Sequence, residues 1–197
     1  MTAKRLYHSI RLQLIRGPRK RAEYLKKHHL FGAIGDNCFW GPKKLPLYPE
    51  LIKIHDNVSI HKRASLLTHD MINSFLKRCS PETDLGSPER LGCIEIMDNV
   101  YVATRAYIMP NVRIGKNCIV TVGSVVSSDI PENSIVAGVP AKPVGRFDMM
   151  LAMRKMQASQ TAKFQNQVLP ANIAEVEWEK FYNRHKDVKQ TADNNID

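Results

Sequence analysis

The chain has 197 residues, of which 43% are hydrophobic, and it carries a net charge of +10. This length is sufficient for one compact domain with a sizeable core and appendages. The N-terminal region lacks the apolar run of about 7–15 residues that marks a secretion signal, and no segment approaches the roughly 20 apolar residues of a membrane span. We therefore expect a cytoplasmic protein.

Residues 1–30 are expected to form a basic helical arm. This segment holds nine Lys and Arg residues against one Glu, which gives it a net charge of +8. Leu6, Ile10 and Leu14 recur at helical spacing until Gly17-Pro18 interrupts the pattern. We expect this apolar stripe to pack on the end of the following domain. Contact with an anionic membrane surface is the alternative. Nucleic acid is not expected as a partner, because the arm lacks interleaved aromatic residues and a recognised binding motif.

A six-residue repeat occupies residues 96–130. Its first positions are aliphatic: Ile96, Val102, Ile108, Ile114, Val120 and Val126. Its fifth positions are small or branched: Val100, Ala106, Val112, Cys118, Ser124 and Ile130. This spacing is typical of a parallel β-helix, in which three hexapeptides close one triangular coil. The sequence thus predicts an all-β solenoid whose stacked coils bury continuous aliphatic ladders.

The same register extends toward the N-terminus. It includes Ile54, Ile60 and Leu66, and a weaker copy starts at Ile34. The step from Ile34 to Ile54 is not a multiple of six. We expect the repeat to slip register across a proline-containing link between these two positions.

Residues 71–93 are expected to leave the coil as an external loop. The step from Leu66 to Ile96 keeps the register of the repeat, but Arg78, Asp84 and Arg90 stand where aliphatic residues are required. Charged side chains cannot line an apolar interior. Long structureless loops in compact domains are usually functional, so we expect this one to take part in function.

The regular coil is expected to end near Ile130, and residues 136–147 to form a final irregular turn. Beyond it, apolar residues at helical spacing predict packing surfaces of a helical extension with a break at Pro170. These residues are Met149, Met153, Met156, Trp178, Phe181 and Tyr182. The predicted organisation is an arm at 1–30, a β-helix at 31–147 and a helical extension at 148–197.

The four cysteines do not suggest disulfides or zinc. Cys38 and Cys118 fall on interior fifth positions, where a thiol behaves as a small apolar group. Cys79 and Cys93 flank the external loop without the spacing of metal ligands. A reducing compartment fits this pattern.

His69 is the strongest candidate for a catalytic group. It stands where the first block of repeats meets the external loop, and a neutral imidazole can accept a proton at physiological pH. Asp70, next to it, would either orient the imidazole or end the strand in a turn. Both alternatives stay open at this point.

Four segments resemble the hexapeptide-repeat acyltransferases, a family that includes galactoside, maltose, serine, xenobiotic and capsule-sugar O-acetyltransferases. The segments are residues 92–100, 110–115, 123–131 and 136–142. The resemblance covers roughly residues 31–147. It implies a left-handed parallel β-helix, flanked here by the N-terminal arm and a C-terminal helix. It further implies a homotrimer whose active sites lie between subunits.

The resemblance also implies a reaction. His69 matches the family's general base, which removes a proton from the acceptor as the acceptor attacks the thioester of acetyl-CoA, without an acyl-enzyme or a metal. The expected activity is acetyl-CoA-dependent O-acetylation of a sugar hydroxyl in a polysaccharide, a lipopolysaccharide or a sugar precursor. The acceptor would be a small molecule or a glycan. Acetylation of an amino sugar on nitrogen, or of a drug such as chloramphenicol or a streptogramin, are alternatives.

Positions in the later repeats match the family's coenzyme A contacts. These are Ala103, Thr104 and Val122 beside the pantetheine arm, and Ser127, Ser128, Lys142 and Arg146 near the phosphates. Cationic groups suit the phosphate charges. The chain departs from the family pattern by losing a basic residue at Ser128 and a glycine at the second position of most repeats. Because glycine adopts positive φ freely, we expect the second loss to alter the corners of the coil.

Two other functions compete with acyl transfer. A γ-type carbonic anhydrase needs three histidines on one zinc ion, but His55, His61 and His69 all fall within less than one coil of three hexapeptides. These histidines cannot stack on one edge, so this function is rejected. A scaffold trimer without catalysis is the non-enzymatic alternative.

Overall fold

The computed structural model describes residues 3–160 and 172–193. The chain divides into two units, Met1–Met153 and Arg154–Asp197. The helices are α1 (Ala3–Leu14), α2 (Pro18–Lys27), η1 (Pro49–Leu51, a 3₁₀ helix), α3 (Ile72–Cys79), α4 (Phe147–Gln160) and α5 (Ile173–Asp193). Within these described ranges, no helix is both long enough and apolar enough to cross a membrane.

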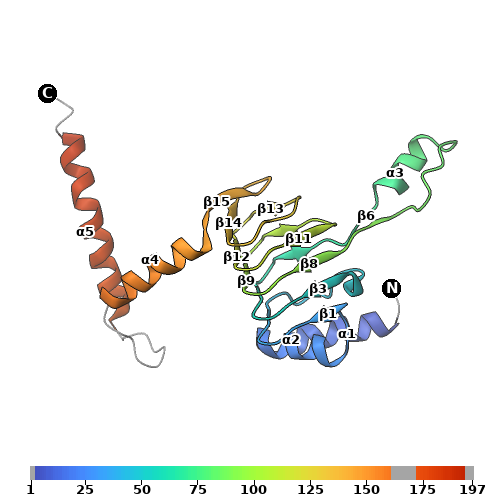
Figure 1. Ribbon diagram of the computed structural model, residues 1–197, viewed down its shortest axis with the longest axis horizontal. Helices are drawn as coiled ribbons and strands as arrows, with labels where there is room; N and C mark the ends of the chain where they lie inside the picture. The colour runs from blue at the N-terminus through green and yellow to red at the C-terminus, as the bar shows by residue number, and fades with distance from the viewer. Residues whose placement is uncertain (1–2, 161–171, 194–197) are drawn as a thin grey trace. The chain divides into compact units, whose positions relative to one another are not determined.

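Short strands, parallel except for the last one of sheet B, form three sheets in the first unit (Figure 1). Sheet A contains β1 (Ala33–Ile34), β3 (Ile52–Ile54), β8 (Ile94–Ile96) and β11 (Val112–Ile114). Sheet B contains β2 (Phe39–Trp40), β4 (Ser59–Ile60), β9 (Val100–Val102), β12 (Cys118–Val120), β14 (Ser134–Ala137) and β15 (Lys142–Arg146). Sheet C contains β5 (Ser65–Leu66), β10 (Tyr107–Ile108) and β13 (Val125–Val126).

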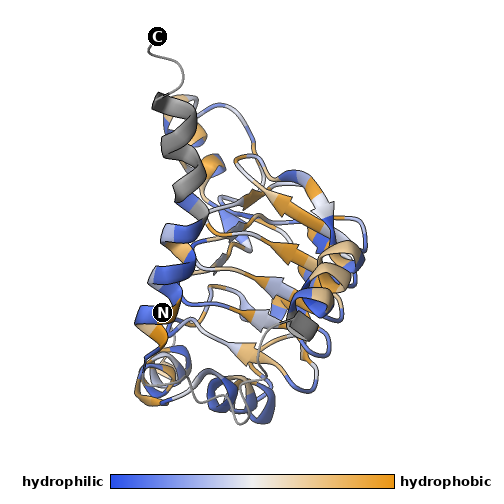
Figure 2. Ribbon diagram, turned by 90° about the vertical axis from the view of Figure 1, so that its left-hand side faces the viewer, coloured by the Kyte–Doolittle hydropathy of each residue, from blue (hydrophilic) through white to orange (hydrophobic). Residues whose placement is uncertain are grey.

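The chain passes through sheets A, B and C in turn and returns to the first sheet after three hexapeptides. Ile94 pairs with Val112, and Tyr107 pairs with Val125. The repeat positions of residues 96–130 form the core, and none of these side chains is more than 5% exposed. Figure 2 shows the corresponding hydrophobic colour along the strands. The predicted aliphatic ladders are therefore confirmed.

The earlier block of repeats stacks as predicted across the link. Ile34 pairs with Ile54, so the slip of register occurs in the link between these two strands. The interior positions of Cys38 and Cys118 are also confirmed, because both thiols are buried and burial raises the pKa of each. A thiol with a raised pKa remains uncharged and packs as an apolar group.

The corners of the coil differ from the expectation about glycine. Met97 and Ala103, which replace second-position glycines, do not have positive φ. Positive φ falls further along each corner, on Asn99, Arg105 and Asn117, with values of 59°, 61° and 55°. Asparagine tolerates this conformation because its short polar side chain hydrogen-bonds locally. The expectation that losing these glycines alters the corners was therefore wrong.

The arm is helical, but it packs through a different face from the predicted one. Helix α1 buries Leu12, whereas Leu6, Ile10 and Leu14 are 45%, 50% and 68% exposed. The expected packing of this stripe on the end of the coil was wrong. Helix α2 makes the contact with β1 and β2 instead, at the end of the stack where Figure 1 shows both helices.

The external segment contains a helix that the sequence analysis did not predict. In the regular coils Ile96 pairs with Ile114, whereas Ile54 pairs with Ile96, so the turn between these two strands carries a long insertion. The insertion includes α3 and a two-stranded antiparallel sheet formed by β6 (His69–Asp70) and β7 (Arg90–Leu91). Ile72, Phe75 and Leu76 of α3 stand at helical spacing, so the sequence held a signal for this helix, although these side chains are exposed and do not join the core.

The C-terminal part also contains more regular structure than expected. Residues 136–147 include β15, which pairs antiparallel with β14 in place of an irregular turn. Met149 and Met153 of α4 are exposed in the single chain, as are Trp178, Phe181 and Tyr182 of α5. Their role as packing surfaces stays a prediction. The predicted break at Pro170 lies outside the described residues.

Candidate functional site

His69 lies where sheet C ends and the external segment begins. After β5, the N–H of Leu67 donates to the carbonyl of Ile108 at 2.9 Å, which continues the coil. The hydroxyl of Thr68 donates to the carbonyl of Leu47 in the proline-containing link. His69 then pairs with Leu91 across β6 and β7. The coil and the link therefore fix the backbone on the N-terminal side of His69.

The imidazole of His69 packs against an aromatic ring. Its ring centroid lies 5.8 Å from that of Tyr48, edge to face, and the hydroxyl of Tyr48 donates to Glu89 at 2.5 Å. This hydrogen bond to a carboxylate raises the pKa of Tyr48, since it favours the protonated phenol. Nδ1 of His69 is buried, and it has no hydrogen-bond partner within the described residues. No contact at Nδ1 therefore sets the tautomer of His69 in the described part of the single chain.

Asp70 has a local partner. Its Oδ1 accepts a hydrogen bond from the N–H of Ile72 at 3.0 Å, at the start of α3. This contact is an Asx turn, in which an aspartate binds the backbone two residues further on. Of the two alternatives for Asp70, the contact favours the turn over the orientation of His69.

His69 also lines a cavity of about 620 Å³ between the link and the coil. The lining residues come from 40–47 on one side and from 62–69 on the other. Trp40, Leu45 and Leu66 contribute buried apolar surface, and Lys43, Lys44, Lys62 and Arg63 contribute positive charge. The cavity is large enough for a small molecule.

The link that forms one wall of this cavity is anchored at both ends. The buried guanidinium of Arg21 donates to the carbonyls of Trp40 at 3.0 Å and Gly41 at 3.1 Å. At the far end, the hydroxyl of Thr68 binds the carbonyl of Leu47. These bonds fix a segment that has little regular structure of its own, so the cavity exists within a single chain.

Sequence reasoning missed these cavity residues, although a signal was present. The basic pairs Lys43-Lys44 and Lys62-Arg63 are separated by nearly the same step that separates Ile34 from Ile54. The two basic pairs therefore occupy nearly equivalent positions of neighbouring coils. The arm holds more charge along the sequence, whereas these two pairs are brought to one cavity by the stacking of coils.

Five of the seven candidate coenzyme A residues fall at the two ends of sheet C. Thr104 and Val122 lie at the corner where the chain enters this sheet, and the N–H of Gly123 donates to the carbonyl of Thr104 at 3.1 Å. Ala103, at the same corner, is buried, whereas Val122 is 68% exposed. Ser127 and Ser128 are exposed and follow β13 at the exit end, the end at which His69 follows β5.

Lys142 and Arg146 are exposed on β15. The guanidinium of Arg146 makes two hydrogen bonds to the carboxylate of Asp148, and this contact lowers the pKa of Asp148. Lys142 lies next to Ala141, whose N–H donates to the carbonyl of Val125 in sheet C at 2.8 Å. Lys142 is therefore close to the last coil, while Arg146 already has an anionic partner.

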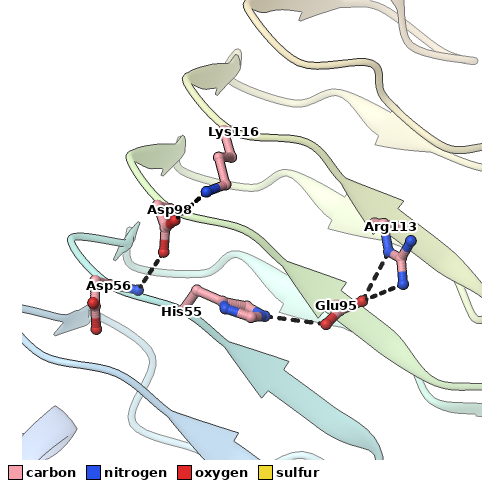
Figure 3. Close-up of polar contacts among 6 residues, drawn as sticks. All are labelled: His55, Asp56, Glu95, Asp98, Arg113 and Lys116. Atoms are coloured by element: carbon pink, nitrogen blue, oxygen red, sulfur yellow. Dashed lines mark hydrogen bonds and ion pairs between the residues drawn. The ribbon is translucent and has the colours of Figure 1, made fainter.

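A separate polar network covers sheet A and the corner that follows it (Figure 3). Glu95 accepts hydrogen bonds from His55 at 3.1 Å and Arg113 at 2.8 Å, and these partners lower the pKa of Glu95, with His55 as the larger cause. Lys116 pairs with Asp98 at 3.0 Å. His55 is thus engaged with a carboxylate. Over the described ranges, no group of three or more His, Cys, Asp or Glu residues is arranged to hold a metal ion.

Residues 94–128 match the family model of the bacterial transferase hexapeptide (six repeats). The resemblance to the hexapeptide-repeat acyltransferases is confirmed. The matched segment contains strands β8 to β13, in which the coil of three hexapeptides is regular. The core periodicity of these coils is therefore the feature that the chain shares with the family.

Curated relatives include both O- and N-acetyltransferases. The galactoside O-acetyltransferase of Lactococcus lactis is 28% identical over 141 residues, which is 62% of this chain and 66% of the relative. A 2,3,4,5-tetrahydropyridine-2,6-dicarboxylate N-acetyltransferase of Clostridium perfringens is 42% identical over 64 residues, 32% of this chain and 27% of the relative. The chain thus spans from about a quarter to just under two thirds of the length of these relatives.

Among solved structures, a hexapeptide-repeat-containing acetyltransferase of Vibrio cholerae has the same fold. It superposes with a TM-score of 0.58 at 20% sequence identity, covering 74% of this chain and 89% of that protein. The same protein in complex with acetyl coenzyme A superposes with a TM-score of 0.54 at 21% identity, covering 72% and 86%. At these identities the likeness concerns the fold.

Proposed function

We propose that this chain is an acetyl-CoA-dependent O-acetyltransferase that acts on a sugar hydroxyl. The observation that carries the proposal is the position of His69. This imidazole lines a cavity beside a hexapeptide-repeat coil, and the relatives and structural neighbours named above are acetyltransferases. No other residue of the cavity lining could serve as a neutral proton acceptor near pH 7, because the remaining ionisable groups there are Lys43, Lys44, Lys62 and Arg63.

In the proposed reaction, His69 removes the proton of the acceptor hydroxyl as its oxygen attacks the thioester carbonyl of acetyl-CoA. The tetrahedral intermediate then collapses, the carbon–sulfur bond breaks, and the imidazolium returns the proton to the departing thiolate. A positioned base of this kind typically contributes about 10²–10⁴-fold to the rate. The reaction needs neither an acyl-enzyme nor a metal ion.

The proposal includes a left-handed coil and a homotrimer with sites between subunits. One feature supports an intersubunit site. Thr104 and Val122 lie at the entry end of sheet C, and Ser127 and Ser128 lie at the exit end, so one chain does not gather them around a single point. A cyclic assembly would place the corner of one subunit beside that of the next. Analytical ultracentrifugation tests the trimer.

We assign acetyl-CoA to the corner that contains Ala103, Thr104 and Val122, with its phosphates toward Lys142. The exposed side chain of Val122 and the cationic Lys142 support this placement. Ser127 and Ser128 would add hydroxyl donors. Arg146 is the weaker candidate because Asp148 already pairs with it.

Acetylation of an amino sugar on nitrogen or of a drug remains the alternative, and the N-acetyltransferase relative gives it support. A scaffold trimer without catalysis is the non-enzymatic alternative.

The deciding experiment measures thiol release from acetyl-CoA with sugars, amino sugars, chloramphenicol and a streptogramin, for the wild type, His69→Ala and the surface control His185→Ala. Sugar-dependent release that only His69→Ala loses supports the proposal. Thiol release confined to the amino sugars or to a drug would contradict the proposal of a sugar hydroxyl as the acceptor. Thiol release that is unchanged in His69→Ala would contradict the assignment of His69 as the general base.

We also propose that the arm contacts an anionic membrane surface. Leu6, Ile10 and Leu14 form an exposed apolar stripe on α1, and Arg11 and Arg16 beside it are exposed. Such a helix binds anionic lipid through both buried apolar area and charge. We expect the protein to co-sediment with phosphatidylglycerol vesicles but not with phosphatidylcholine vesicles. We also expect the variant Ile10→Ser/Leu14→Ser to lose this co-sedimentation. Both results would support the contact. Equal sedimentation with both lipids would contradict it.

A further inference from the structure

We propose that the cavity beside His69 binds an anionic acceptor, a saccharide that carries a phosphate or carboxylate group. This inference rests on the proposed function, and it names the chemical class of the acceptor. It is carried by the charge of the cavity, by the arrangement of its lining, and by the place of the cavity in the stack of coils.

The charge of the lining has one sign. Lys43, Lys44, Lys62 and Arg63 line the cavity, and no Asp or Glu does. None of these four cations is in an ion pair among the residues that the structure describes. Two cations elsewhere on the coil are paired, Lys116 with Asp98 and Arg113 with Glu95. Four uncompensated cations around one concave surface attract an anion and focus its approach.

The arrangement of the lining suits a ligand with an apolar face and a charged group. The four cations are exposed, whereas Trp40, Leu45 and Leu66 are 2%, 6% and 5% exposed. The bonds from Arg21 and Thr68 hold the link in place. The cavity therefore offers a fixed apolar floor with positive charge at its rim. Lysine and arginine groups bind phosphate or carboxylate through charge-assisted hydrogen bonds.

The place of the cavity in the stack favours the acceptor over coenzyme A. Ser59 of β4 pairs with Tyr101 of β9, so the corner at Lys62 precedes the corner at Thr104 by one coil. With the coenzyme A phosphates toward Lys142, at the far end of the stack, the thioester end points toward the coil of Lys62 and His69. A cationic cavity at that end meets the group that receives the acetyl, and not the phosphates of the donor.

The test compares acceptors and lysine variants. Glucose, glucuronic acid and glucose 1-phosphate are the probes, and thiol release and isothermal titration calorimetry are the readouts. The variant Lys43→Gln/Lys44→Gln removes two rim charges. The matched control Lys20→Gln/Lys27→Gln removes two exposed charges of α2, so the net charge is the same. Equal unfolding midpoints would confirm that both variants are folded.

We expect the charged probes to bind and glucose not to bind. The rim variant should weaken their binding by about tenfold, as lost hydrogen bonds to a charged group do, and the control should not. Binding should also weaken as ionic strength rises. Comparison of glucuronic acid with glucose 1-phosphate separates a carboxylate from a phosphate.

Three results would overturn the inference. These are equal binding of glucose and the charged probes, unchanged binding in the rim variant, and a rise in the KM of acetyl-CoA in that variant, which would assign the cations to the donor. Failure of the proposed function is distinguishable, because charged probes would then bind through the rim lysines without any thiol release.

Discussion

The side-chain amide of Asn99 donates to the side-chain oxygen of Asn117 at 2.9 Å, and the two residues occupy the same corner position of neighbouring coils. Asn57 donates to Asn99 at 2.8 Å and accepts from Asn37 at 2.9 Å, so four asparagines form one ladder along the stack. All four have positive φ, between 52° and 59°. The ladder gives hydrogen-bond partners to the side-chain amides of these asparagines, which the corner holds at positive φ.

Replacement of Asn99 by alanine should destabilise the protein by about 3–4 kcal/mol. Alanine at positive φ costs about 1–2 kcal/mol, and each lost hydrogen bond adds about 1 kcal/mol. Asn99→Gly removes the same hydrogen bonds but adopts the corner freely, so its loss should be smaller by about 1 kcal/mol. Urea denaturation at one fixed protein concentration measures both. Equal losses in the two variants would show that the backbone conformation is not the cause.

Replacement of Asp70 by alanine should affect α3 more than catalysis. The carboxylate accepts the first N–H of the helix, and loss of such a contact costs about 1 kcal/mol. Hydrogen exchange of the α3 amides should accelerate about fivefold, while kcat falls less than about tenfold and the pH profile of kcat/KM keeps its position. A shifted profile in Asp70→Ala, with Asp70→Asn behaving in the same way, would instead assign Asp70 to the orientation of His69.

Glu95 should contribute stability that is lost in acid. His55 and then Arg113 hold the pKa of Glu95 below its ordinary value of 4.5. A depressed carboxyl pKa stabilises the folded state above the ordinary pKa, and this contribution disappears as pH falls through the folded pKa. The difference in unfolding free energy between the wild type and Glu95→Gln should therefore be constant above about pH 5 and shrink below it. The exposed control Glu132→Gln should show a smaller change, and parallel curves for wild type and Glu95→Gln would refute the assignment.

Gly41 is required by close packing in the wall of the cavity. A Cβ atom on Gly41 would lie 2.6 Å from the backbone nitrogen of Lys62 and 2.7 Å from the carbonyl carbon of His61. Gly41→Ala should therefore destabilise the protein by about 1–3 kcal/mol, as overpacking does. Gly145→Ala is the control, because its nearest neighbour would be a side-chain carbon of Ile135 at 3.7 Å. Thermal unfolding measures both, and an unchanged midpoint in Gly41→Ala would show that the link can move.

The sequence alone determined the core of this protein. Stacked coils could be predicted from the aliphatic residue at every sixth position, such as Ile96, Val102 and Ile108. Each of these positions recurs in the same interior environment, so the requirement for an aliphatic side chain can be read from the local sequence. The slip between Ile34 and Ile54 could also be predicted, since it follows from counting positions along the chain. His69 could be singled out from its place at the end of a repeat block and from the family resemblance.

The tertiary structure decided what the repeat does not encode. It placed positive φ on Asn99 and not on Met97, because the corner turns beyond the first residue after the strand. It buried Leu12 of α1 in place of Leu6, since a helix with apolar residues on several sides packs through whichever face meets the coil. It also brought Lys43 and Arg63 to one cavity with His69. The sequence separates these residues, and the stacking of neighbouring coils, together with the anchoring of the link by Arg21 and Thr68, joins them.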